Sequence, residues 1–355
     1  SLASITIPDG VTSIGYEAFA GCSSLASITI PDGVTSIGDF AFEDCSSLAS
    51  ITIPDSVTSI GQQAFNNTAY YNDESNWEND VLYIGNHLIR ARSTLSGAYT
   101  IRNSIKTIAD YAFYYCSGLT SITIPDSVTN IGDWAFYNCN KLTSVTIGNG
   151  VTSIGRSAFE DCSSLASITI PDSVTSIGRG ALSGCSSLTS IEIPDGVTSI
   201  GDGAFDYCKS LASIKIPDSV TSIGGGAFSR CYELSAVYIT NIVAWCNIQF
   251  GGEAANPLHE AHDLYLNGEL VTDLVIPDGV TGIGGFAFYN CSSLTSIEIS
   301  DSVTNIGDSA FRGCSSLTSI EIPDSVTSIG DNAFFDCGSL ASITIPDGVT
   351  SIGYE

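Results

Sequence analysis

One short unit repeats along the chain at a spacing of i, i+23, and this repeat constrains the fold more than any other feature. The unit at 25–47 reads LASITIPDGVTSIGDFAFEDCSS. An Ala-Phe or Ala-Leu pair recurs twelve times, from Ala18-Phe19 to Ala333-Phe334. A unit this short cannot bury its apolar face alone, so neighbouring copies must stack on one another. The repeat therefore predicts a solenoid.

Each unit contains its own short elements. Residues 27–30 (SITI) alternate polar and apolar side chains, which predicts a strand with both isoleucines inward. Pro31-Asp32-Gly33 ends this strand, and residues 34–37 form a second extended piece. The stretch from Gly38 to Cys45 suits a helical or 3₁₀ turn that places Phe42 in the core. The sequence thus predicts 23-residue coils with a parallel β-sheet on one side and short extended, helical or 3₁₀ turns on the other.

The full pattern, L-x-S-I-x-I-P-D-x-V-T-S-I-G-x-x-A-F-x-x-C, resembles the BspA-like class of leucine-rich repeats. This class occurs in surface proteins of bacteria and some protists. The resemblance covers about twelve units, and segments 79–90 and 244–273 are similar to stretches that interrupt such arrays. It implies a leucine-rich-repeat solenoid in an extracellular or cell-surface location. Some members adhere to host extracellular proteins, so the resemblance also implies a binding or adhesion role.

Two irregular stretches, 66–98 and 238–272, interrupt the register. The step from Phe65 to Phe113 equals two units plus 2, and this predicts a degenerate coil. The step from Phe228 to Phe288 equals two units plus 14, so an extra loop is expected there, with 254–261 as the candidate. We therefore predict a single solenoid domain over residues 1–355.

The two ends carry the same sequence, SLASITIPDGVTSIGYE, at 1–17 and 339–355. Both ends stop within a unit. This predicts either a segment of a longer array or a chain whose copies associate end to end, because an exposed strand edge invites pairing.

The charge balance limits the possible partners. The chain has 11 Lys and Arg against 38 Asp and Glu, a net charge of −27. Nucleic acid and anionic membrane surfaces are therefore excluded as default partners, and a ligand with a basic patch is favoured. The apolar runs are all shorter than the roughly 18 residues that a membrane span needs, which argues against membrane insertion.

Motifs for catalysis or metal binding are missing from the sequence. Eleven of the twelve cysteines share one repeat position, which predicts a column of inward free thiols, and no C-x-x-C is present. Cys246 lies outside the column. His259 and His262 are spaced i, i+3, unlike the zinc motif H-E-x-x-H. No nucleophile elbow or phosphate loop occurs. The sequence predicts no enzyme, no cofactor and no metal site.

Aromatic residues supply the first candidate ligand site. Tyr111 and Trp134 are spaced i, i+23, as are Tyr114 and Tyr137, so each pair is expected to stack in adjacent coils beside Tyr115. Exposed aromatic clusters are typical anchors for protein or sugar ligands. The preceding irregular stretch adds three further candidates: Tyr70, Tyr71 and Trp77. The alternative is that these rings only pack the irregular coil onto the array.

A second candidate lies on the sheet. The outward position between the two isoleucines is threonine in most coils but changes to Glu192, Lys215 and Tyr238 in consecutive coils. These changes mark either ligand contacts or neutral drift. The sequence as a whole favours an extracellular binding or adhesion module for a host protein or glycan. The alternative is a structural spacer or self-associating surface array with no specific ligand.

Overall fold

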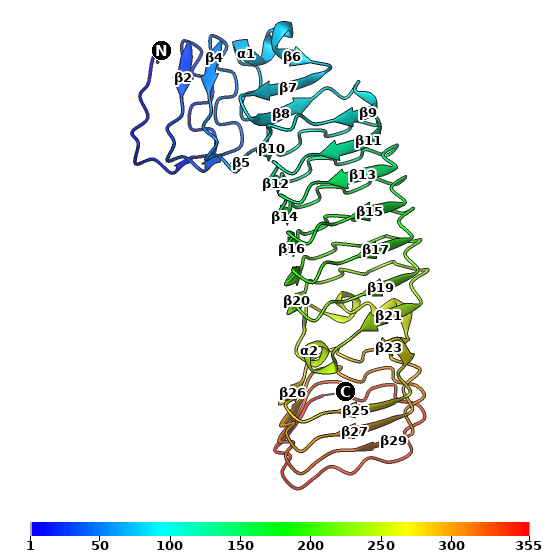
Figure 1. Cartoon of the computed structure of the whole chain (residues 1–355). Coiled ribbons are helices and arrows are strands. Elements are labelled where there is room, and N and C mark those ends of the chain that lie inside the picture. The colour runs from blue at the N-terminus through cyan, green and yellow to red at the C-terminus, as the bar shows by residue number, and fades with distance from the viewer. Residues whose placement is uncertain (1, 355) are drawn as a thin grey trace. The chain divides into compact units, whose positions relative to one another are not determined.

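The computed structural model describes residues 2–354 and contains two compact units, one up to Val174 and one from Thr175 onward. Each unit is a parallel β-solenoid (Figure 1). A regular coil has three parts: a first strand in the S-I-x-I segment, a second strand in the V-T-S-I segment, and a run of turns from the following glycine to the cysteine. We name this third part the turn ribbon. The expected single continuous domain stays a prediction.

In the first unit, strands pair in parallel with partners in the next coil, as Ser27 does with Ser50. The first strands are β2 (Ser27–Thr29), β4 (Ser50–Thr52), β9 (Ser96–Thr100), β11 (Gly118–Ile124), β13 (Ser144–Ile147) and β15 (Ser167–Thr169). The second strands are β1 (Ser13–Ile14), β3 (Ser36–Ile37), β5 (Ser59–Ile60), β10 (Thr107–Ile108), β12 (Asn130–Ile131) and β14 (Ser153–Ile154).

The second unit repeats this arrangement. Its first strands are β17 (Ser190–Glu192), β19 (Ser213–Lys215), β21 (Ala236–Ile239), β25 (Asp273–Ile276), β27 (Ser296–Ile299) and β29 (Ser319–Glu321). Its second strands are β16 (Ser176–Ile177), β18 (Ser199–Ile200), β20 (Ser222–Ile223), β26 (Gly282–Ile283), β28 (Asn305–Ile306), β30 (Ser328–Ile329) and β31 (Ser351–Ile352). Each unit therefore has parallel sheets along two sides of the coil, because the second extended segment also pairs with its copies.

The turn ribbon differs from the helical or 3₁₀ turn expected from sequence. Ala41 N donates to Gly38 O over 3.3 Å, whereas the next amide, Phe42 N, donates to Ala64 O of the following coil over 2.8 Å. Amides thus bond alternately within their own coil and to the neighbour. Phe40 and Asp44 have φ of 57° and 59°, which a right-handed helix does not allow.

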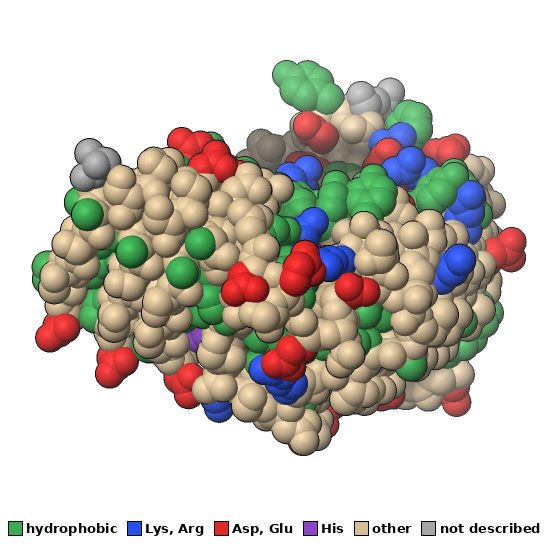
Figure 2. Space-filling model, turned by 90° about the horizontal axis from the view of Figure 1, so that it is seen from above, with side chains coloured by type: hydrophobic (Ala, Val, Ile, Leu, Met, Phe, Trp, Pro, Cys, Tyr) green, Lys and Arg blue, Asp and Glu red, His purple; other side chains and the backbone are tan. Residues whose placement is uncertain are grey.

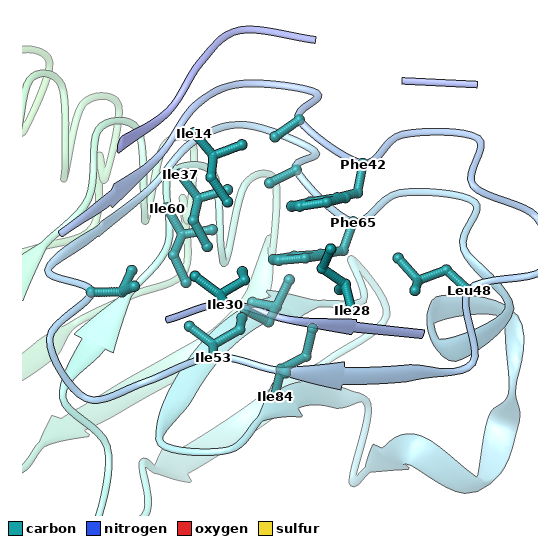
Figure 3. Close-up of a cluster of buried hydrophobic side chains, with 14 of the residues drawn as sticks. Ile14, Ile28, Ile30, Ile37, Phe42, Leu48, Ile53, Ile60, Phe65 and Ile84 are labelled. Atoms are coloured by element: carbon teal, nitrogen blue, oxygen red, sulfur yellow. The ribbon is translucent and has the colours of Figure 1, made fainter. Parts of the chain in front are cut away.

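The core follows the predicted pattern. Ile28, Ile30 and Phe42 are buried, and the inward cysteine column is confirmed. Phenylalanines of successive coils stack, with Phe42 and Phe65 ring centroids 5.4 Å apart at an interplanar angle of 4° (Figure 3). Full burial of one such side chain contributes about 1.5–3 kcal/mol. Repetition of this contact holds the coils together.

The first irregular stretch is an insertion with antiparallel strands, not a degenerate parallel coil throughout. It contains α1 (Ala69–Asn72), η1 (Glu74–Asn76), β6 (Trp77–Glu78), β7 (Val81–Ile84) and β8 (His87–Ala91). Strands β6, β7 and β8 pair in antiparallel order, and β8 then pairs in parallel with β10. The insertion thereby rejoins the array at the coil that carries Tyr111.

The second irregular stretch contains the expected extra loop. Its elements are α2 (Ile242–Cys246), β22 (Gln249–Phe250), η2 (Glu253–Ala255), α3 (Leu258–Ala261), β23 (Leu264–Leu266) and β24 (Glu269–Leu270). The candidate loop segment is partly helical, in η2 and α3, where an irregular loop was expected. No helix within residues 2–354 is long and apolar enough to cross a bilayer.

Candidate ligand-binding site on the turn ribbon

Five aromatic side chains form one cluster on the turn ribbon of the first unit, as their spacing predicts. Tyr111 and Trp134 stack with centroids 5.0 Å apart and an interplanar angle of 22°. Tyr114 and Tyr137 stack at 5.1 Å and 16°. Tyr115 lies edge-on to Tyr114 at 4.6 Å and is 45% exposed. We name these five residues the aromatic cluster.

The backbone holds the cluster rigidly. Tyr111, Tyr115 and Trp134 have positive φ values of 59°, 60° and 51°. Their amides bond to the next coil: Tyr115 N donates to Tyr137 O over 2.9 Å, and Trp134 N donates to Arg156 O over 2.8 Å. The rings are therefore fixed by the same ladder that stacks the coils, which lowers the entropy lost on ligand binding.

Several polar groups of the cluster have no protein partner. The indole N–H of Trp77 donates to Tyr71 O over 2.7 Å, and that of Trp245 donates to Ala287 O over 2.8 Å. The indole N–H of Trp134 has no acceptor among residues 2–354, although tryptophan N–H groups usually find one when enclosed. Burial raises the pKa of Tyr137 to about 12, with Asp161 adding to the shift, so this phenol is neutral at physiological pH.

Two arginines that the sequence analysis did not single out border the cluster. The guanidinium of Arg156 lies 4.5 Å from the Trp134 ring centroid. Arg90 Nη1 donates to Tyr111 O over 2.6 Å. Neither arginine forms an ion pair in the part of the chain that the structure describes. By contrast, Arg92 and Arg102 are paired with Glu74 and Glu78.

The aromatic cluster lies in the segment that holds most of the basic residues of the chain. Residues 1–89 contain no Lys or Arg, whereas residues 90–156 contain six of the eleven, against three aspartates. The segment that carries the cluster thus has a formal charge of +3 within a chain of −27. Figure 2 shows hydrophobic side chains gathered on one face, with Lys and Arg as well as Asp and Glu side chains beside them. Carboxylates lie on both sides of the cluster, since Glu160 and Asp161 are near Tyr137 and Asp110 and Asp39 are near Tyr111. Arg90 and Arg156 are the basic groups beside Tyr111 and Trp134.

A small cavity of about 50 Å³ lies beside Arg90. Tyr71, Arg90 and Asp110 line it, together with Gln63 and Asn66. Asp110 Oδ1 accepts a hydrogen bond of 2.7 Å from Asp133 N, and burial raises its pKa to about 7. The carboxyl of Asp110 is therefore only partly ionised at neutral pH. Arg90 is then the main charged group that lines the cavity.

The aromatic residues of the insertion have a different position from the cluster. Tyr70 donates from its hydroxyl to Tyr83 O over 3.0 Å, and Tyr71 lies edge-on to Trp77 at 5.2 Å. The Trp77 ring also contacts Arg92 at 4.4 Å. All three side chains pack against the buried core. They hold the insertion in place, and no ring contact joins them to the aromatic cluster within residues 2–354.

The sheet-face candidates lie on the second unit. Glu192, Lys215 and Tyr238 are exposed on β17, β19 and β21, and Lys215 is paired in register with Tyr238. The Tyr238 ring contacts Tyr265 of β23 at 4.9 Å. Tyr265 was missed from sequence because the insertion shifts its spacing from Tyr238 to i, i+27.

The histidine loop packs onto the coil that follows it. Within the described residues, no group of three or more His, Cys, Asp or Glu side chains is placed to hold an ion. His259 stacks on Tyr289 at 5.7 Å and 12°, and His262 ends α3 with a φ of 64°. These contacts give the loop a packing role.

Stacked coils that repeat at i, i+23 and pair in parallel sheets define the chain as a leucine-rich-repeat solenoid. The model of the BspA-type leucine-rich repeat region, which has six copies, matches residues 1–117, 93–188, 177–249 and 263–355. The chain therefore belongs to the BspA-type leucine-rich-repeat family. The search of curated proteins gave no match.

Several solved bacterial structures are similar to the chain. A leucine-rich repeat protein from Bacteroides ovatus is 32% identical, with a TM-score of 0.54, over 97% of this chain and 78% of that one. The pneumococcal vaccine antigen PcpA is 20% identical, with a TM-score of 0.51, over 78% and 77% of the two chains, a likeness of fold alone. A leucine-rich cell surface protein from Faecalibacterium prausnitzii is 28% identical over 99% and 86%, with a TM-score of 0.38.

Proposed function

We propose that the chain is a non-catalytic binding or adhesion module of an extracellular or cell-surface protein, and that its ligand is a host protein or glycan. The aromatic cluster is the contact surface. The observation that carries this proposal is the rigid cluster of two stacked ring pairs with Tyr115 edge-on, in which the Trp134 indole N–H has no protein acceptor among the described residues. Membership of the BspA-type family supports the location.

Rings of this kind suit a binding surface for an energetic reason. Tyrosine and tryptophan bury a large apolar area for the loss of two side-chain torsions, so interface energy concentrates on them. Here those torsions are already restrained by stacking between coils. The threonine-rich remainder of the surface offers less, since hydroxyls that exchange water for a ligand gain little net free energy.

The alternative, a structural spacer without a ligand, also has an observation in its favour. Threonine hydroxyls of the turn between the strands donate to carbonyl groups of the preceding coil, as Thr58 does to Thr35 and Thr221 does to Thr198. These hydroxyls serve the stacking of coils. A surface built in this way supports an array in which repetition is itself the function.

The first prediction separates these functions and the two candidate surfaces. The chain is tested for saturable binding to a panel of extracellular-matrix proteins and glycans, and for self-association by analytical ultracentrifugation. We expect saturable binding that the Trp134→Ala/Tyr137→Ala variant weakens at least tenfold. The Glu192→Ala/Lys215→Ala variant should bind as the unchanged chain does.

Circular dichroism and the urea midpoint serve as folding controls for both variants. Self-association without saturable binding to any panel member would favour the spacer. Loss of binding only in the Glu192→Ala/Lys215→Ala variant would place the ligand on the sheet face instead.

A further inference from the structure

The aromatic cluster carries information on the chemistry of its ligand, and this inference rests on the proposed function. The polar groups of the cluster and its border that lack a side-chain partner within residues 2–354 are hydrogen-bond donors or cations. Trp134 offers an indole N–H, Tyr111 and Tyr137 offer hydroxyls without a protein partner among residues 2–354, and Arg90 and Arg156 have no ion pair there. A surface rich in donors and positive charge selects a ligand rich in acceptors and negative charge.

These groups lie in four successive layers of the solenoid. Arg90 belongs to the insertion, Tyr111 and Trp134 to the next two coils, and Arg156 to the third. Neighbouring strands are about 4.8 Å apart, so the layers extend over roughly 15 Å. The surface is therefore elongated, with an arginine at each end and rings between them.

In the second unit, groups of the chain itself cover the tyrosine that corresponds to Tyr114 of the aromatic cluster. Tyr289 occupies the place, two positions before the column cysteine, that Tyr114 occupies in the first unit. The ring of His259 stacks on Tyr289 at 12°, and Glu253 accepts a hydrogen bond of 2.9 Å from the Tyr289 hydroxyl. Arg312 lies 3.8 Å from the Glu253 carboxylate. The loop before this coil thus supplies a ring and a carboxylate, and Tyr289 is only 6% exposed.

The first unit has no such loop over its cluster. Tyr114 stacks face to face with Tyr137 alone among the described rings, and Tyr115 beside it is exposed. Tyr114 has ring contacts with Tyr111 and Tyr115 but no carboxylate partner among the described residues. The carboxylate that the second unit takes from its own chain is here left to a ligand. A saturated sugar ring meets an aromatic face through its C–H groups, which carry partial positive charge toward the negative face of the ring. A carboxylate meets a guanidinium through paired hydrogen bonds.

We infer that the aromatic cluster of this chain binds an acidic glycan, a short run of pyranose rings that bear carboxylates. The sugar rings lie against Tyr114 and the exposed Tyr115, beside the edge of Trp134, because Tyr111 and Arg156 already cover the Trp134 ring. The carboxylates pair with Arg156 at one end and with Arg90 at the other, beside the cavity that Asp110 lines. Carboxylated pyranoses occur as uronic acids and as sialic acids, and the test distinguishes these two sources.

The experiment measures binding of the full chain to two acidic probes, trigalacturonate and sialyllactose, by isothermal titration calorimetry. The matched neutral probes are the trigalacturonate methyl ester and lactose. We expect one acidic probe to bind at least tenfold more tightly than its neutral partner. Arg156→Gln should weaken that binding about tenfold, and Arg156→Lys should weaken it less, because it keeps the charge but loses the paired geometry.

Lys209→Gln is the control, since Lys209 lies 4.0 Å from the Tyr207 ring in the second unit and forms a similar cation–ring contact away from the cluster. It should leave binding unchanged. Equal binding of acidic and neutral sugars, or equal binding by the Trp134→Ala variant, would overturn the inference. So would displacement of the sugar by single-stranded DNA at the same affinity.

The inference and the proposed function fail in different ways. If neither acidic probe binds, but a matrix protein binds and depends on Trp134 and Tyr137, the glycan inference is wrong and the binding module stands. If nothing on the panel binds at all, both are wrong.

Discussion

The cysteine of each regular coil joins two coils through its thiol. Cys139 Sγ lies 3.3 Å from Phe113 O, and Cys314 Sγ lies 3.2 Å from Phe288 O, so each S–H donates to a carbonyl of the preceding coil. Burial raises the pKa of Cys116, Cys231 and Cys291 to about 12. The protonated thiol is therefore both the hydrogen-bond donor and the form that the apolar surroundings favour.

The reactivity of these thiols provides a prediction at the residue scale. The native chain at pH 8 should react with iodoacetamide first at Cys22, which is half-buried, while the eleven buried thiols are protected. After unfolding without reductant, close to twelve thiols should react, because all twelve are free in the structure. Mass spectrometry of labelled peptides gives both counts. A count near zero after unfolding would show that the cysteines form disulfides.

The same pKa shifts fix the direction of the pH dependence. A thiol whose pKa rises on folding binds its proton more tightly in the native state, so its contribution to stability is complete below the unfolded value near 9. That contribution is lost as the pH rises from about 9 to the folded value of about 12 for Cys231. The urea midpoint should fall over this range, and it should fall less in a Cys231→Ala variant.

At the scale of the element, the turn ribbon repeats two positions of positive φ in every regular coil, one directly before the cysteine and one five residues before it. Five positions before the cysteine, φ is positive whichever residue is present. Glycine occupies it at Gly180, Gly203 and Gly226, with φ of 61°, 59° and 65°, whereas the aromatic cluster has Tyr111 and Trp134 there. A side chain in this conformation costs about 1 kcal/mol relative to glycine. In the first unit this cost recurs in every regular coil, since all the residues at this position have side chains: Glu17, Phe40, Gln63, Tyr111, Trp134 and Ser157.

This strain predicts that Trp134→Gly is more stable than Trp134→Ala, although glycine is ordinarily the less stabilising of the two residues. Trp134→Ala removes the stacking with Tyr111, worth about 0.5–1.5 kcal/mol, and keeps the strained turn. Trp134→Gly removes the same contact but relieves the strain, so it should be more stable than the alanine variant by about 1 kcal/mol. Urea unfolding of the two variants measures the difference. Ser157→Gly against Ser157→Ala, at the next coil, is the control without a ring. A Trp134→Gly variant less stable than Trp134→Ala would contradict the assigned strain.

The regular elements were predictable because a single rule specifies them. Alternation at Ile28 and Ile30 and the recurrence of Phe42 describe every coil, so the strands, the core and the stacked pairs Tyr111–Trp134 and Tyr114–Tyr137 follow from spacing. The prediction of a helical turn was wrong because Phe40 has a positive φ. Phenylalanine ordinarily avoids this conformation, so the residue type gives no sign of it. Two sheets formed where one was expected, because the second extended segment also pairs.

The insertions and the charges of the site were not predictable from the repeat. Strands β6 to β8 pair antiparallel through contacts that the repeat register does not encode. Arg90 lies on one of these strands, so its contact with Tyr111 depends on a fold that the sequence pattern does not describe. The position of Arg156 could have been predicted from the sequence, since it follows Trp134 at i+22 in a regular coil. Arg156 and Trp134 stand at different repeat positions, so a comparison of identical positions at i, i+23 does not bring them together.

At the scale of the whole molecule, the net charge of −27 does not decide the charge of the ligand. The Debye length is about 8 Å at physiological ionic strength, so the acidic coils far along the solenoid are largely screened from the aromatic cluster. The guanidinium groups of Arg90 and Arg156, unpaired within residues 2–354, act at contact distance, where screening is weak. A repeat protein can therefore combine a soluble, acidic surface with a local site for anions.

Stability in a stacked repeat is the sum of contacts between nearest neighbours, and this makes a last prediction possible at the same scale. Phe311 is fully buried in the second unit and stacks on Phe288 at 5.3 Å and on Phe334 at 5.6 Å. Phe136 is its matched counterpart in the first unit, where it stacks on Phe113 at 4.8 Å and on Phe159 at 5.0 Å. Truncation of either ring to alanine should cost about 3–5 kcal/mol locally.

Hydrogen exchange measured by mass spectrometry should show which strands lose stability in each variant. In Phe311→Ala, amides of β26, β28 and β30 should lose protection, because their coils share the Phe288–Phe311–Phe334 stack, while amides of β11 and β13 in the first unit should exchange as before. Phe136→Ala should give the reciprocal pattern. If instead β11 and β28 lose protection by the same factor in both variants, the chain unfolds as one cooperative body. The single-domain prediction would then hold energetically, and the nearest-neighbour account of its stability would be wrong.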